Sequence, residues 1–271
     1  VQDVNNKLYL FSDKGNLYWK KQIPGQIQGT VHQIDLYKNK RLQMAFRTED
    51  NFFVLDRNGK ILKPFSIKIP STEPIQQLAV FDYDLRRNYR FVLAQGKSIL
   101  MYDNNGKRMS GFTFKKTKTP IINPPVHIRI DKKDYIVVQE ESGKLNLLNR
   151  IGKSRIKAKE SITFSGTPVS SYLKTFTTSD TEGNLVQVDT KGNVVKTSLE
   201  LVTDHAIATT TKSLVTLSEN ILTIKGVPIT LPYGRYTAPR IFYINNIIYI
   251  TTTDLDAQKV HLYFSNGTAV S

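Results

Sequence analysis

The stretch LYLFSDKGNLYWKKQI, at positions 8–23, places two runs of β-forming side chains on either side of a short polar turn that ends in Gly15. The same phrase recurs as FFVLDRNGKILKPFSI at 52–67 and ILMYDNNGKRMSGFTF at 99–114, and looser copies follow at 145–159, 185–199, 221–231 and 260–271. A glycine supplies the positive φ that a tight hairpin turn requires, and Leu, Ile, Val, Phe and Tyr suit a pleated, half-buried surface. Each stretch therefore predicts a β-hairpin.

The hairpin recurs along the whole chain. A glycine marks each copy: Gly15, Gly59, Gly106, Gly152, Gly192, Gly226 and Gly267. Successive marker glycines lie 34 to 47 residues apart. Two more strand-like runs lie between the hairpins, and the first of them often begins at proline, as in PVHIRIDKK at 125–133. Four strands in a repeat of roughly 40 residues are typical of one blade of a β-propeller.

The sequence therefore predicts an all-β protein, a seven-bladed β-propeller of four-stranded antiparallel blades with one blade incomplete. We expect a single domain over residues 1–271. Its approximate repeats are 1–25, 29–70, 74–118, 125–165, 168–201, 205–232 and 239–271. The first repeat supplies only one hairpin, so six blades plus an N-terminal hairpin are the alternative. Because no run remains to complete the partial blade, we expect the domain to be excised from a longer parent chain.

The composition limits the chemistry and suggests the kinds of partner. The chain carries 38 Lys and Arg against 23 Asp and Glu, a formal net charge of +15, and no cysteine. The lack of cysteine excludes disulfides, thiolate metal sites and cysteine nucleophiles. The positive charge attracts polyanions such as nucleic acid, anionic glycan or lipopolysaccharide, or an acidic protein face. No apolar run reaches the roughly 18 residues of a membrane span, so the sequence predicts no transmembrane segment.

The turn from Gly15 to Trp19, Gly-Asn-Leu-Tyr-Trp, resembles the repeat of the pyrroloquinoline-quinone-like propellers. This superfamily contains quinoprotein dehydrogenases and BamB-like non-enzymatic scaffolds. The resemblance implies that Trp19, four residues after the turn glycine, docks between blades; no other copy has tryptophan there. A quinoprotein enzyme would also have an adjacent cysteine pair and a cluster of acidic and amide ligands for calcium. Neither is present in the sequence, so we expect no enzyme activity and no cofactor.

The stretch FDYDLRRNYRF at 81–91 resembles segments of envelope propellers of Bacteroidota. This resemblance implies a periplasmic or otherwise extracytoplasmic location. The lack of cysteine suits an oxidising compartment and equally a cytosolic protein. We expect a monomeric domain that presents its loops or its axial funnel to a protein partner, because such folds place their binding sites on loops held by a rigid scaffold.

Three histidines occupy the first strand of their repeats: His32, His127 and His205. The first strand of a blade is innermost, so these side chains are candidates for an axial channel that binds a metal or an anion. The simpler interpretation, which we favour, is that neighbouring groups satisfy each ring separately. The acid pairs Asp82 with Asp84 and Asp254 with Asp256 lie in polar turns and lack the density of a calcium loop. We therefore expect no catalytic or metal site.

Two groups of cations are candidates for anion binding. Lys153, Arg155, Lys157 and Lys159 alternate along one fourth strand, and Arg86, Arg87 and Arg90 surround a turn between first and second strands. Alternation along a strand directs side chains to one face. Outermost strands also carry lysine to prevent edge-to-edge aggregation, and we favour that interpretation for the alternating group.

The sequence thus favours a non-enzymatic propeller scaffold that mediates protein–protein interaction in the cell envelope. The alternative is a polyanion-binding domain that uses the basic surface for glycan, lipopolysaccharide or nucleic acid. A degenerate quinoprotein-like enzyme ranks third, because the sequence contains no recognisable catalytic cluster.

Overall fold

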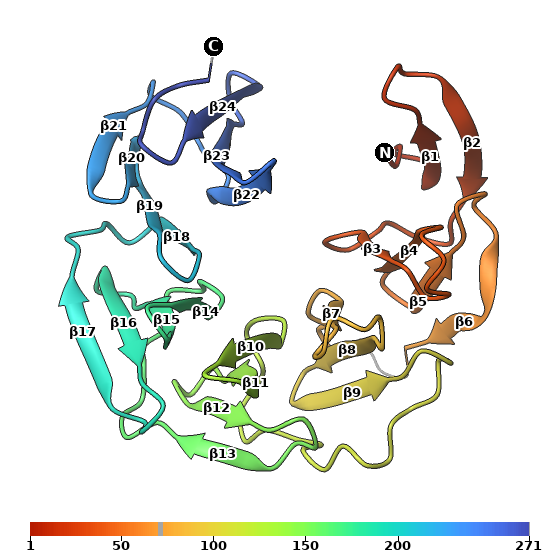
Figure 1. Cartoon of the computed structure of the whole chain (residues 1–271), viewed down its shortest axis with the longest axis horizontal. Helices are drawn as coiled ribbons and strands as arrows, with labels where there is room; N and C mark the ends of the chain where they lie inside the picture. The colour runs from red at the N-terminus through yellow and green to blue at the C-terminus, as the bar shows by residue number, and fades with distance from the viewer. Residues whose placement is uncertain (70–72, 271) are drawn as a thin grey trace. The chain divides into compact units, whose positions relative to one another are not determined.

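The computed structural model describes residues 1–69 and 73–270, and strands are the only regular secondary structure in them. The strands form seven separate sheets, four with four strands, two with three and one with two (Figure 1). Within each sheet, every strand pairs with its neighbour in the chain. Residue 70, which ends the second repeat, and residue 271, which ends the last, lie outside the described part. None of the described segments is a helix that could cross a membrane.

The chain divides into two compact units, which we describe separately. The first comprises Val1–His127 with Arg150–Lys153, and the second comprises Ile128–Asn149 with Ser154–Ser271.

The first unit contains three sheets. The strands of the first sheet are β1 (Lys7–Phe11) and β2 (Leu17–Gln22). Those of the second are β3 (His32–Ile34), β4 (Gln43–Arg47), β5 (Asn51–Leu55) and β6 (Ile61–Lys68). Those of the third are β7 (Ala79–Phe81), β8 (Arg90–Gln95) and β9 (Ser98–Tyr102).

The second unit contains four sheets. The fourth sheet consists of β10 (Val126–Ile130), whose first two residues belong to the first unit, β11 (Lys133–Gln139), β12 (Leu145–Leu148) and β13 (Ser154–Lys157). The fifth consists of β14 (Ser170–Tyr172), β15 (Thr175–Ser179), β16 (Asn184–Val188) and β17 (Val194–Ser198). The sixth consists of β18 (His205–Thr209), β19 (Leu214–Ser218), β20 (Ile221–Ile224) and β21 (Val227–Thr230). The seventh consists of β22 (Arg240–Ile244), β23 (Ile247–Asp254) and β24 (Lys259–Phe264).

The burial of the strands follows their position in the sheet. In β5 and β12 nearly every side chain is buried, whereas β13 and β17 have no buried side chain. A middle strand that is covered on both faces has a continuous apolar sequence, whereas an outer strand can contain charged residues. This difference explains why the middle strands β5 and β11 contain FFVL and YIVV, while the outer strands β6, β13 and β17 contain lysine.

Neighbouring sheets pack face to face within each unit. In the first unit the ring of Phe52 on β5 lies 5.0 Å from that of Phe91 on β8, and Phe65 of β6 lies 5.5 Å from the same ring. In the second unit Tyr135 of β11 and Phe176 of β15 meet edge to face at 4.9 Å. All except Tyr135, which is 2% exposed, have 0–1% of their surface exposed, so the core lies between sheets.

The marker glycines of the hairpins all have positive φ, as the repeat predicts. Gly59, at φ +78°, shows why a side chain is excluded: a Cβ there would lie 3.0 Å from the indole of Trp19. The indole Nε1–H donates a 2.7 Å hydrogen bond to the carbonyl of Arg57 in the same turn. The expectation that Trp19 docks between blades is therefore confirmed for the first and second sheets.

Three sheets have fewer than four strands, whereas the sequence predicts only one incomplete blade. In the third sheet a turn at Ser110 and Gly111 interrupts the fourth strand, so β9 pairs with that segment only through isolated bridges to Arg108 and Lys116. In the seventh sheet the described part of the corresponding segment, up to residue 270, forms one isolated bridge, between Tyr263 and Ala269. The repeat is thus complete in the sequence while its fourth strand is irregular in the structure.

Candidate functional site

Two loops of the first unit, β3–β4 (residues 35–42) and β7–β8 (residues 82–89), have the same conformation, which their first aspartates determine. The carboxylate of Asp35 accepts hydrogen bonds from the backbone N–H groups of Asn39, at 3.0 Å, and Lys40, at 2.9 Å. The carboxylate of Asp82 accepts from the residues at the same two offsets, at 3.2 and 2.8 Å. An aspartate side chain thereby replaces the strand partners that these N–H groups lack.

The backbone of the two loops matches as well. The third and fifth residues after each aspartate have left-handed φ: Lys38 at +57° and Lys40 at +63°, Leu85 at +54° and Arg87 at +61°. The first-to-second-strand turns β10–β11, β14–β15 and β22–β23 of the second unit instead have two consecutive left-handed residues. The longer, carboxylate-centred loop is therefore a feature of the second and third sheets.

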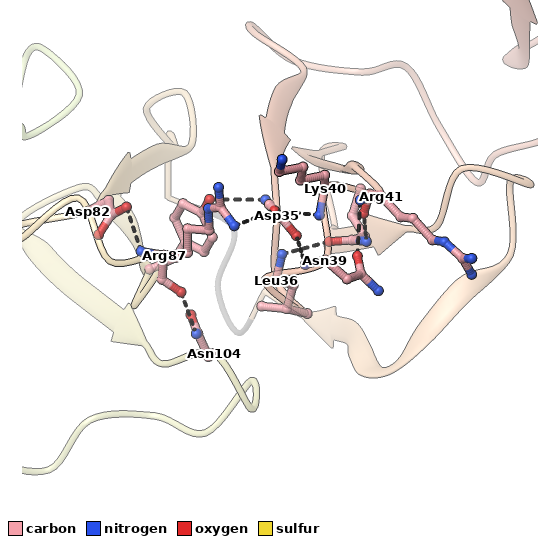
Figure 2. Close-up of polar contacts among 10 residues, drawn as sticks. Asp35, Leu36, Asn39, Lys40, Arg41, Asp82, Arg87 and Asn104 are labelled. Carbon is pink, nitrogen blue, oxygen red and sulfur yellow. Dashed lines mark hydrogen bonds and ion pairs between the residues drawn. The ribbon is translucent and has the colours of Figure 1, made fainter.

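An ion pair joins the two loops. Arg87 Nη1 lies 2.9 Å from Asp35 Oδ2, and the Asp35 residue is only 4% exposed. The Tyr89 hydroxyl accepts a hydrogen bond from the Asp35 backbone N–H at 3.0 Å, and Asn104 Nδ2 donates to the carbonyl of Arg87 at 3.0 Å (Figure 2). The β7–β8 loop is thus bonded to the second sheet and to the turn after β9.

A second arginine, Arg150, also holds the β7–β8 loop. Both terminal nitrogens of Arg150, which belongs to the first unit, donate to the Asp84 carboxylate, at 3.0 and 2.5 Å. The guanidinium also lies over the ring of Tyr83, 4.8 Å from its centroid. A bidentate, stacked arginine restricts orientation as well as distance. Leu85, at the tip of this loop, is therefore held between two ion pairs.

Each of the two loops exposes apolar and cationic side chains. Leu85 is 88% exposed, Tyr37 56% and Leu42 45%. We use the name loop surface for Tyr37, Lys38, Lys40, Arg41, Leu42, Leu85 and Arg86. Within the described residues, the side chains of Lys40, Arg41 and Arg86 form no ion pair or hydrogen bond, whereas Lys38 donates to Asn88 Oδ1 at 3.0 Å.

The predicted histidines lie in the first strands of their sheets, and each has its own neighbours. His32 Nε2 lies 2.8 Å from the carbonyl of Leu78; burial lowers the pKa of His32, and this hydrogen bond partly opposes the shift. The ring of His127 packs edge to face on Tyr83 at 4.9 Å. His205 Nδ1 lies 2.6 Å from the carbonyl of Val202. The three rings thus have separate neighbours, and Nε2 of His205 is buried without a hydrogen-bond partner. The described residues contain no group of three or more His, Asp or Glu side chains that could hold a metal.

The four cations predicted along the fourth strand of the fourth sheet contact different residues. Lys153 precedes β13, the outermost strand, and belongs to the first unit, whereas Arg155, Lys157 and Lys159 belong to the second. A bulge between β12 and β13 disturbs the alternation beside Arg155, whose guanidinium lies 5.5 Å from the ring of Tyr135. Lys159 Nζ donates to Asn193 Oδ1 at 2.6 Å.

The second predicted group, Arg86, Arg87 and Arg90, divides into different roles. Arg87 forms the ion pair with Asp35, Arg90 donates to the carbonyl of Tyr89 at 2.9 Å, and Arg86 is exposed. The β3–β4 half of the loop surface is not among the residues that were predicted from the sequence. The signal was present: IDLYKNKRLQ at 34–43 and FDYDLRRNYR at 81–90 share an aspartate after an apolar residue and cations four to six positions later.

The two predicted pairs of acidic residues lie in turns, and their carboxylates form hydrogen bonds and ion pairs there. Asp82 and Asp84 have the roles described above. Asp254 accepts hydrogen bonds from the backbone N–H groups of Asp256 and Ala257, both at 2.9 Å. Asp256 pairs with Arg235 at 2.8 Å, and the hydrogen bonds from Arg235 lower the pKa of that carboxyl.

Comparison with known proteins identifies the fold. No protein-family model matches the sequence, and no curated protein is similar to it. The solved structure of BBS1N in complex with ARL6DN is similar with a TM-score of 0.66 and 15% identity, over 91% of this chain and 80% of that one. BamB from Moraxella catarrhalis is similar with a TM-score of 0.61 and 15% identity, over 96% and 77%. The Dos1 propeller gives 0.65 and 12%, over 98% and 75%. The chain therefore has a β-propeller fold that is similar to that of BamB.

Proposed function

We propose that this propeller is a non-enzymatic scaffold that binds a protein partner through the loop surface. The observation that carries the proposal is Leu85, an 88% exposed leucine on a loop held by ion pairs on both sides. Exposed apolar groups on rigid loops bind partners with little loss of conformational entropy, because the loop is already ordered. Tyr37 and Leu42 are exposed apolar side chains of the neighbouring β3–β4 loop.

The composition of the loop surface supports a protein rather than a polyanion. Binding to phosphate or sulfate groups depends on cations and on counterion release, and leucine side chains contribute nothing to it. Protein interfaces combine tyrosine and arginine with an apolar centre. The loop surface has this combination: Leu42 and Leu85, with Tyr37, Arg41 and Arg86.

We also propose that the protein acts in the cell envelope. Support comes from the resemblance of its repeat to propellers of the envelope and from the fold likeness to BamB. Fractionation of cells that express the full-length protein tests this location. Recovery in the cytoplasmic fraction would contradict it.

The binding function is tested by cross-linking the tagged full-length protein in cells and recovering partners at low and at high salt. We expect a discrete protein that survives high salt and is lost from a variant with Tyr37→Ser and Leu85→Ser. The matched control is Leu173→Ser, which removes a leucine 57% exposed from a left-handed turn position of the second unit. Recovery of nucleic acid or glycan alone, lost at high salt, would contradict the proposal.

A further inference from the structure

We infer that the loop surface binds an acidic segment of its partner, in which an apolar side chain is flanked by Asp or Glu. The inference rests on the proposed function and adds the chemistry of the segment. It depends on three features of the loops: unpaired cations, acids that are already occupied, and an apolar residue in a conformation that the fold alone does not favour.

The cations of the loop surface are available to a partner. Lys40, Arg41 and Arg86 are exposed and have no side-chain partner among the described residues. Charges that are exposed and uncompensated attract the opposite charge over distances of about 10 Å at ordinary ionic strength. A segment with several carboxylates matches them, and such complementarity increases the rate of association and fixes the register of binding.

The acids of the same loops cannot neutralise these cations. The carboxylate of Asp35 accepts two backbone N–H groups and pairs with Arg87. The carboxylate of Asp82 accepts two backbone N–H groups, and that of Asp84 pairs with Arg150. Each carboxylate is thus used within the fold. The positive charge of the surface therefore remains for an external acidic group.

Leu85 supplies the apolar anchor. Its φ of +54° is unfavourable for any residue with a Cβ, and glycine or asparagine is the usual choice for such a position. Its side chain is 88% exposed and so contributes little to the core. Leu173 is also left-handed and exposed, but Leu85 differs from it because two ion pairs hold its loop and the cation that follows it has no side-chain partner among the described residues, and these features favour a contact outside the fold. Arg86 directly follows Leu85 in the sequence, so the apolar side chain and the cation can both contact the same short segment of the partner.

The probe is a displayed library of random peptides, selected on the immobilised full-length protein, with affinities of the enriched peptides measured by fluorescence anisotropy. We expect peptides in which Asp or Glu flank a Leu, Phe or Trp. Leu85→Ser and Arg86→Glu should each weaken binding at least tenfold. The matched controls are Leu173→Ser and Lys157→Glu, which alter an exposed leucine in a left-handed turn and an exposed cation on β13; both should retain wild-type affinity.

A further variant separates binding from folding. Leu85→Gly removes the side chain and relieves the left-handed strain, so the protein should unfold at an equal or higher denaturant concentration while peptide affinity still falls at least tenfold. A parallel loss of stability would instead show that Leu85 serves the fold, and would overturn the inference.

Other outcomes also decide the question. Enriched peptides without acidic residues, or acidic peptides that bind Leu85→Ser as tightly as the wild type, overturn the inference. Tighter binding of a single-stranded oligonucleotide than of any peptide, unaffected by Leu85→Ser, assigns the surface to polyanions and overturns it too. A cellular partner that depends on the loop surface but contacts it through a segment without acids contradicts the inference alone. The absence of any partner that depends on this surface contradicts the proposed function itself.

Discussion

The guanidinium of Arg87 lies 2.9 Å from the buried carboxylate of Asp35, and this ion pair fixes the β7–β8 loop to the β3–β4 loop. The carboxylate has a double role, because it also accepts the backbone N–H groups of Asn39 and Lys40 within its own loop. One side chain therefore determines both the shape of a loop and its attachment to the neighbouring sheet (Figure 2).

The two roles predict unequal costs of substitution. Asp35→Ala leaves two backbone N–H groups and Arg87 without their acceptor, and we expect a loss of about 2–3 kcal/mol in the free energy of unfolding. Arg87→Ala removes a partner that is 40% exposed while the carboxylate keeps its two backbone bonds, so the expected loss is about 0.5–1 kcal/mol. Urea unfolding of both variants measures the difference. Equal losses would show that the ion pair, and not the backbone capture, is the main contribution of Asp35.

The contact between Trp19 and Gly59 predicts a second difference. Gly59→Ala places a Cβ 3.0 Å from the indole at φ +78°, whereas Gly15→Ala has nothing within 4 Å at φ +81°. The left-handed strain, about 1–2 kcal/mol, is common to both. We expect Gly59→Ala to cost a further 1–3 kcal/mol or so, since the hydrogen-bonded indole has to move. Thermal and urea unfolding measure this, and Trp19 fluorescence should shift in Gly59→Ala alone.

The repeat and its turns were predictable because they depend on local chemistry. A glycine after aspartate or asparagine requires only the backbone preference of a few residues, and Trp19 continues the same short stretch. The loop surface was only partly predictable. Its two halves are separated by about 50 residues in the sequence, and pairing Asp35 with Arg87 requires knowing that the second and third sheets are neighbours.

The histidines show the same limit. Their position in first strands followed from the repeat, but their contacts come from other parts of the chain: Leu78 for His32, and Tyr83 for His127. The irregular fourth strand of the third sheet was not predictable either. Ser110 and Gly111 form a turn there, although the flanking side chains are of the type found in strands.

The environment of His32 predicts a dependence of stability on pH. Burial lowers its pKa below the 6.5 of the unfolded chain, so the unfolded state takes up its proton first as the pH falls. The free energy of unfolding should therefore decrease as the pH falls below about 6.5, and this contribution is absent above that range. His32→Gln keeps a donor for the carbonyl of Leu78 but does not titrate. The pH profile of wild type minus variant isolates the effect, and a difference that is flat between about pH 7.5 and 5.5 would contradict it.

The bidentate ion pair between Arg150 and Asp84 predicts how the rigidity of the loop around Leu85 can be altered without changing any residue of the loop surface. Lysine at position 150 keeps the charge but loses the bidentate geometry and the stacking on Tyr83, so Arg150→Lys should loosen the loop while costing less than about 1 kcal/mol of global stability. Hydrogen exchange of residues 82–87 should become faster, and the affinity for the selected acidic peptides should fall about threefold to tenfold.

Asp84→Asn is the complementary variant. It removes the other half of the pair, and the double variant should be no looser than either single one, because all three lack the same clamp. Additive effects on exchange would show that Arg150 and Asp84 hold the loop independently. If Arg150→Lys weakened peptide binding with exchange unchanged, Arg150 would contribute by contact with the peptide, and the boundary of the loop surface would have to include it. Faster exchange with unchanged affinity would show that a rigid Leu85 is not required for binding.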